Sequence, residues 1–114
     1  MLKYFELFHV IVTLGILMLK IIIEKNSYEL IKNYKEAFQE EMFKERYTSY
    51  FEPYDYIVGD IAYNKLRLKG FYDEKNKKVK SINNYSNLEN YLKENCATDC
   101  KYFILKKVEE KDEE

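Results

Sequence analysis

Two apolar, aromatic-rich runs with a short polar break between them fill the chain from Tyr54 to Tyr72. In the second run, Lys65, Arg67 and Lys69 occupy every other position between apolar residues. Alternation with a period of two is typical of strands that bury one face. The pattern therefore predicts a β-hairpin with one apolar face and one basic face.

The segment before this hairpin predicts two strands and a helix. Residues 18–33 read as a strand, a polar turn at residues 24–27 and a second strand. Asn33 followed three residues later by Glu36 matches a capping box, so we expect a helix to begin there and to continue to about residue 48.

The segment after the hairpin predicts a loop, a helix and a strand. Residues 73–84 are polar and rich in lysine, as in an exposed loop. Ser86 and Glu89 form a second capping box, which predicts a short helix that ends near Asn95. Alternating apolar residues at 102–108 predict the last strand.

The order of these elements is strand, strand, helix, strand, strand, helix, strand. The connections are hairpin-like and lack regular βαβ spacing, which favours an α+β fold. We expect a small, mostly antiparallel sheet of about five strands with two helices packed on one face. A chain of 114 residues is long enough for one such domain and too short for two.

Both ends of the chain differ from this body. Residues 1–17 include most of an apolar run at 7–19, which is shorter than the roughly 20 residues of a membrane-spanning helix. We interpret 1–17 as an extension outside the working protein, with a short membrane anchor as the alternative. The domain then covers 18–108, and the acidic segment 109–114 is expected to be a disordered tail.

Composition excludes several kinds of active site. Three glycines cannot build a glycine-rich phosphate loop, and the one histidine, His9, lies in the N-terminal extension. A Ser/His/Asp nucleophile set or a Cys/His zinc site within one chain is therefore not expected. The 12 tyrosines and 7 phenylalanines, with no tryptophan, predict an aromatic core.

The hairpin and the loop after it carry the candidate binding residues. Residues 65–80 hold seven basic and two acidic residues, interleaved with aromatic residues such as Phe71. This composition is typical of phosphate-binding surfaces and also of solvated lysine-rich loops. Arg67 is one of two arginines, and it either binds a partner or pairs with Asp55 or Asp60 across the hairpin. Asp60 is interpreted as a turn residue at the hairpin tip.

Cys96 and Cys100 are four residues apart. This spacing differs from the CxxC of thioredoxin-like centres, so small packing groups or free thiols are the favoured interpretation. A redox pair, or a metal site shared between two chains, stays open as the alternative.

Three blocks together resemble the YutD-like family, small proteins of Gram-positive bacteria. The first two are YDYIVGD at 54–60 and KLRLKGFYD at 65–73. The closing block consists of Leu88, Tyr91, Leu92, Cys96, Cys100, Tyr102, Phe103, Ile104 and Leu105.

The resemblance covers roughly residues 18–108 and implies a cytoplasmic α+β protein, without implying a mechanism. The chain departs from the family pattern at Ile61 and Ala62, where Trp and Gly usually follow the aspartate. An aromatic contact or a glycine turn at these two positions is therefore not expected.

We expect a non-catalytic cytoplasmic binding module, without cofactor or metal and not attached to a membrane. Its basic hairpin face, with Lys65, Arg67, Lys69, Phe71 and Asp60, would contact an anionic partner, either nucleic acid or an acidic protein surface. The alternative is a thiol-dependent redox or metal-sharing protein that uses Cys96 and Cys100.

Overall fold

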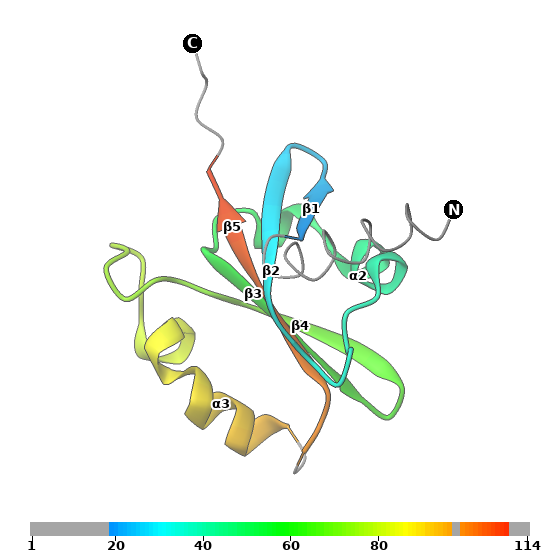
Figure 1. The fold of residues 1–114 in the computed structure, drawn as a ribbon. Helices are drawn as coiled ribbons and strands as arrows, with labels where there is room; N and C mark the ends of the chain where they lie inside the picture. The colour runs from blue at the N-terminus through cyan, green and yellow to red at the C-terminus, as the bar shows by residue number, and fades with distance from the viewer. Residues whose placement is uncertain (1–18, 97–98, 110–114) are drawn as a thin grey trace, which may run out of the picture.

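The computed structural model describes residues 19–96 and 99–109, which form a five-stranded antiparallel sheet and two α-helices. The strand order is β1-β2-β5-β3-β4 (Figure 1). The strands are β1 (Lys20–Ile23), β2 (Asn26–Tyr34), β3 (Tyr56–Ala62), β4 (Lys65–Phe71) and β5 (Tyr102–Val108). The helices are α2 (Glu40–Arg46) and α3 (Leu88–Asn95), and short 3-10 turns occupy Ser49–Phe51, Ser81–Asn83 and Tyr85–Asn87. The predicted α+β class and element order are confirmed.

The β3–β4 hairpin turns at Tyr63 and Asn64. Both residues have positive φ angles, 53° and 63°. Two left-handed residues between antiparallel strands are typical of the hairpin turn whose twist matches that of the strands. Asp60 therefore lies inside β3, opposite Arg67, and its interpretation as a tip residue was wrong.

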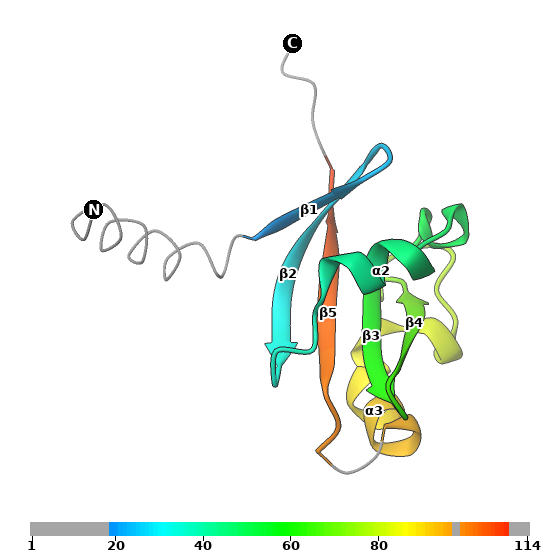
Figure 2. The same cartoon turned by 90° about the vertical axis from the view of Figure 1, so that its right-hand side faces the viewer.

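The sheet has a hydrophobic core on each face. Ile57 and Phe103 pack on one face with Phe43 of α2. Their neighbours in the strands, Val58 and Ile104, point to the other face and pack with residues of α3. The two helices thus cover opposite faces, as Figure 2 shows, and the prediction that both lie on one face was wrong. Apolar residues at successive positions of β3 and β5 are consistent with strands that are buried on both faces.

The first helix begins later than its capping-box pattern predicts. Asn33 lies in β2, and its side-chain oxygen accepts a hydrogen bond from the backbone N–H of Phe38 at 2.9 Å. Lys35 and Glu36 have φ angles of 58° and 54°, which turn the chain away from the strand instead of starting a helix. The Asn33 box prediction was therefore wrong, and α2 starts at Glu40.

The second helix is preceded by a 3-10 turn. Asn84, rather than Ser86, caps that turn, because its side-chain oxygen accepts from the Ser86 N–H at 2.9 Å. The end of α3 at Asn95 agrees with the prediction, and the Cys96 N–H donates to the Leu92 carbonyl at 2.9 Å.

The predictions for residues 1–17 and for most of 109–114 lie outside the described residues. Within the part of the chain that the structure describes, no helix has the length and apolar character needed to span a bilayer.

Candidate functional site

Arg67 lies at the centre of the predicted basic face and binds two groups of the protein itself. Its Nε and Nη2 atoms each lie 2.7 Å from Oδ1 of Asp60, the residue opposite it on β3. Nη2 also donates to the backbone carbonyl of Asn95, the last residue of α3, at 2.7 Å. A guanidinium has several donors in a fixed plane, so one side chain can bridge a carboxylate and a helix end.

The environment of this pair is asymmetric. The Asp60 side chain is 2% exposed, whereas that of Arg67 is 47% exposed. The hydrogen bond and the charge of Asp60 raise the pKa of Arg67. The carbonyls at a helix C-terminus carry a partial negative charge, which a cation stabilises. Arg67 is therefore a structural cation that ties α3 to the hairpin, as in the intramolecular pairing considered from the sequence.

Lys65 and Lys69 have no carboxylate partner among the described residues. The Nζ atom of Lys69 lies 5.2 Å from the ring centre of Phe71 and 5.6 Å from that of Tyr91, which are cation–π distances. Lys65 is exposed at the start of β4. Among the described residues, Arg67 is the one cation of segment 65–80 that lies within 4.0 Å of a carboxylate.

The loop after β4 presents four more lysines. Asp55 organises it, because its Oδ2 accepts from the Asp73 N–H at 2.8 Å and from the Asn76 side-chain amide at 3.0 Å. Lysines at four positions of this loop are exposed: Lys75, Lys77, Lys78 and Lys80. The charge available to a partner therefore comes from lysines around Arg67 rather than from Arg67.

Exposed aromatic rings are found elsewhere than predicted. Phe71 is 1% exposed and belongs to the core beneath α3, so it offers no free stacking surface. Tyr63, at the hairpin tip, is 98% exposed. Sequence reasoning missed Tyr63, although the asparagine beside it was a usable signal for the left-handed turn.

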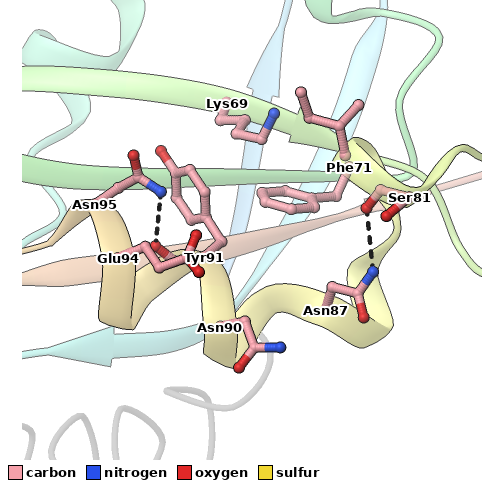
Figure 3. Close-up of a pocket in the computed structure, with 9 residues that line it drawn as sticks. Lys69, Phe71, Ser81, Asn87, Asn90, Tyr91, Glu94 and Asn95 are labelled. Atoms are coloured by element: carbon pink, nitrogen blue, oxygen red, sulfur yellow. Dashed lines mark hydrogen bonds between the residues drawn. The ribbon is translucent and has the colours of Figure 1, made fainter.

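A groove of about 610 Å³ runs along β4 on the side of α3 (Figure 3). Lys69 and Phe71 line its strand side, while Asn90, Tyr91 and Glu94 line its helix side. Burial raises the pKa of Tyr91, and the nearby Asp60 carboxylate adds to this effect. The helix residues of this groove were not among the predicted site residues.

Two hydrogen bonds drawn in Figure 3 fix the walls of this groove. The Asn87 side-chain amide donates to the Ser81 carbonyl at 3.1 Å, and the Asn95 amide donates to the Tyr91 carbonyl at 3.0 Å. Asn90, by contrast, is exposed on the helix surface that lines the groove. The groove therefore has walls held by internal hydrogen bonds, and its lining includes polar and charged side chains.

The cysteine pair lies at the far end of α3. Cys96 and Cys100 are joined in a disulfide, with their Cα atoms 5.9 Å apart. They line a second cavity of about 410 Å³ together with Tyr34 and Asp99. Lys35 and Tyr34 both donate to Asp99, and the hydrogen bond from Lys35 lowers the pKa of Asp99.

Over residues 19–96 and 99–109, no group of three or more His, Cys, Asp or Glu side chains is arranged to hold a metal ion.

Comparison with known proteins gives one consistent result. A family model described as "Putative antitoxin YutD-like" matches residues 22–106. The chain belongs to the YutD-like family. It is 46% identical over 88 residues to a Bacillus subtilis (strain 168) protein named "Putative antitoxin YutD", an alignment that covers 77% of this chain and 97% of that relative.

The solution NMR structure of YutD from B. subtilis has the same fold, with a TM-score of 0.68 and 43% identity. That comparison covers 81% of this chain and 84% of the solved one. The YutD-like resemblance seen in the hairpin and the closing block is thus confirmed. The departure at Ile61 and Ala62 lies at the end of β3, and the turn falls on the two residues that follow.

Proposed function

We propose that this YutD-like protein is a non-catalytic binding module that holds an acidic protein surface on its lysine face. The lysine face is defined as Lys65 and Lys69 of β4 with Lys75, Lys77, Lys78 and Lys80 of the following loop. The observation that carries the proposal is that none of these six has a carboxylate partner among the described residues, while the neighbouring Arg67 does. These six positive charges are thus available to bind the negative charges of a partner.

An acidic protein is favoured over nucleic acid because the two aromatic rings that lie between these lysines in the sequence are buried. Binding of single strands commonly relies on bases that stack on exposed rings inside a basic groove. Phe71 and Tyr72, which lie between these lysines in the sequence, are 1% and 7% exposed. The names of the family and of its B. subtilis relative contain the word antitoxin, which favours a macromolecular partner over a small substrate.

The test compares two polyanions on equal terms. Labelled polyglutamate and a single-stranded RNA of matched length and charge are titrated with the full chain at increasing salt concentrations. We expect polyglutamate to bind more tightly than RNA, and its affinity to fall steeply with salt because surface charges are screened. Tighter binding of RNA would instead identify a nucleic-acid partner and overturn the proposal.

A matched pair of variants assigns the binding to the lysine face. In the first variant, Lys75, Lys77, Lys78 and Lys80 are replaced by Gln. In the control, four exposed lysines of β1, β2, the turn between them and β5 are replaced: Lys20, Lys25, Lys32 and Lys106. The proposal requires the first variant to lose most of the affinity and the control to keep it. Equal losses of affinity in both variants would show that binding depends on net charge and not on the lysine face.

A thiol-dependent function is the second candidate. The disulfide of Cys96 and Cys100 beside an open cavity favours it. Cys96 is the C-cap residue of α3, whereas reactive cysteines are typically found at helix N-termini, which counts against this candidate. Titration of the pair against glutathione buffers tests this candidate, since a redox-active pair exchanges near the cytosolic potential.

A further inference from the structure

We propose that the partner adds a β-strand to the free edge of β4, and that this strand alternates acidic and apolar residues. This inference rests on the proposed function and specifies how the acidic partner is bound. It combines three observations: an unpaired strand edge, a groove beside that edge, and a charge pattern along it.

β4 is an edge strand, since the sheet order ends in β3-β4. Within the described residues, the protein's own chain pairs with this edge only at its end. The Tyr72 N–H donates to the Asn83 carbonyl at 2.7 Å, and the Tyr85 N–H donates to the Tyr72 carbonyl at 2.9 Å. The edge beyond Phe71 is thus already used as a template for pairing, in a parallel bridge between Tyr72 and Asn84.

The direction of this bridge identifies the free backbone groups. In a strand, successive residues direct their N–H and C=O groups to opposite edges. Because Tyr72 faces outward, the groups of Gly70, Leu68 and Leu66 face outward as well, while those between them pair with β3. Their unpaired groups have the arrangement that an added strand uses in β-augmentation complexes, and they lie on the half-buried Leu68 and on the buried Leu66 and Gly70.

The side chains along this edge define what the added strand carries. Lys65, Arg67 and Lys69 alternate with the leucines and so share the α3 face, where Lys69 lines the groove together with Asn90 and Glu94. Leu66 and Leu68 point to the opposite face and join the core beneath α2. A strand laid beside β4 therefore places alternate residues next to lysines and next to leucines, which suits acidic and apolar residues in turn.

The free edge also ends at the strained residue Tyr63. A bulky residue with φ of 53° is uncommon, and its ring is 98% exposed, so no packing in the described structure compensates for the strain. A partner strand that passes the hairpin tip would cover this ring. Tyrosine is among the residues most enriched at the energetic centres of protein interfaces.

The experiment uses the unaltered full chain and defined peptides, so that misfolding cannot confuse the result. The main probe is a heptapeptide of alternating Glu and Val. Two further versions carry N-methyl groups on the Glu residues only or on the Val residues only. An N-methyl group removes a donor and blocks that edge of the peptide, while the side chains stay the same.

Strand addition predicts that one methylated version loses binding, by roughly tenfold or more, because two or three backbone hydrogen bonds are lost. The other version should bind like the parent, since its methyl groups face away from β4. In NMR spectra, the parent peptide should slow amide exchange at Leu66, Leu68 and Gly70.

Two results overturn the edge site while leaving the proposed function intact. One is equal binding of all three peptides, which indicates simple charge attraction. The other is binding of polyglutamate without binding of the alternating peptide. If neither polyglutamate nor the peptides bind, both proposals fail together. A Lys/Val peptide of the same length serves as the charge control and should not bind.

Discussion

Asp60 and Arg67 are direct cross-strand partners, and the buried carboxylate of the first lies 2.7 Å from the guanidinium of the second. Because the same guanidinium reaches the end of α3, the pair links the hairpin to the helix that covers it. The most conspicuous cation of the predicted binding face therefore stabilises the fold, and the binding role passes to the lysines around it.

Removal of Arg67 should destabilise the protein more than removal of any of these lysines. Arg67→Met leaves the Asp60 carboxylate buried and unpaired, and we expect a loss of roughly 1.5–3 kcal/mol in the free energy of unfolding. Urea denaturation measures this loss, with Lys65→Met as the exposed control. The double variant Asp60→Asn with Arg67→Met should regain part of the stability, whereas strict additivity would show that the two residues are not coupled.

A substitution at the hairpin tip should stabilise the protein instead. Tyr63→Asn places a residue that tolerates the left-handed conformation where a bulky one stands now, and we expect a gain of about 1 kcal/mol. Thermal unfolding measures the gain, with Tyr63→Phe as a control that keeps the strain and should leave the stability unchanged. A destabilised Tyr63→Asn variant would mean that the ring makes contacts that its exposure does not reveal.

Two glycines in the sheet make room for aromatic rings. A Cβ atom at Gly59 would come within 2.2 Å of the buried Phe103 ring, and one at Gly70 within 2.3 Å of the Tyr54 ring. Overpacking of this kind typically costs 1–3 kcal/mol. We expect Gly59→Ala to cost more than Gly70→Ala, because Tyr54 is half-buried and its ring can swing aside, while Phe103 is 0% exposed. Chemical denaturation of both variants would test this order.

The aromatic core should make the protein sensitive to alkaline pH. Burial raises the pKa of Tyr28 above its ordinary value of 10.0, and a hydrogen bond with Tyr50 raises the pKa of Tyr54 to about 12. Groups with raised pKa values stabilise the fold fully below pH 10, and this stability is lost as the pH rises through the folded-state values.

Unfolding monitored by circular dichroism between neutral pH and pH 12 should therefore show a steep loss of stability above pH 10. Tyr28→Phe is the matched variant. It loses the hydrogen bond between Tyr28 and Tyr47, 3.0 Å long, at a cost of about 1 kcal/mol at neutral pH, and its stability should fall less steeply with alkali. If the loss of stability with pH were equally steep in Tyr28→Phe, groups other than Tyr28 would account for the alkaline sensitivity.

Local alternation was sufficient to predict the strands, because side-chain period and burial are directly linked in a sheet. It could not assign the two helices to faces. Val58 and Ile104 are apolar like Ile57 and Phe103 beside them, and an uninterrupted apolar run does not tell which residue faces which helix. The groove could not be predicted for the same reason, because Tyr91 reaches Lys69 only through the packing of α3 on the hairpin.

The capping boxes failed for a different reason. Asn33 has the side chain of a helix cap, but the left-handed backbone of Lys35 and Glu36 turns the chain away from a helix. Ser86 lies inside a 3-10 turn that Asn84 caps instead. For the candidate site, the sequence located the charged segment and named the Asp60 pairing as an alternative. It could not choose between a free and a paired Arg67, because that choice depends on distances across the sheet.

The position of β5 has a consequence for how the protein is made. β5 lies between β2 and β3, yet among the five described strands it is the last to be synthesised. Until Val108 has emerged, the β1–β2 and β3–β4 hairpins have no strand to join them, and both faces of the future core stay open to water. Folding of the sheet thus waits for β5, and a nascent chain stalled before Tyr102 would be a substrate for chaperones and proteases rather than a partly working protein.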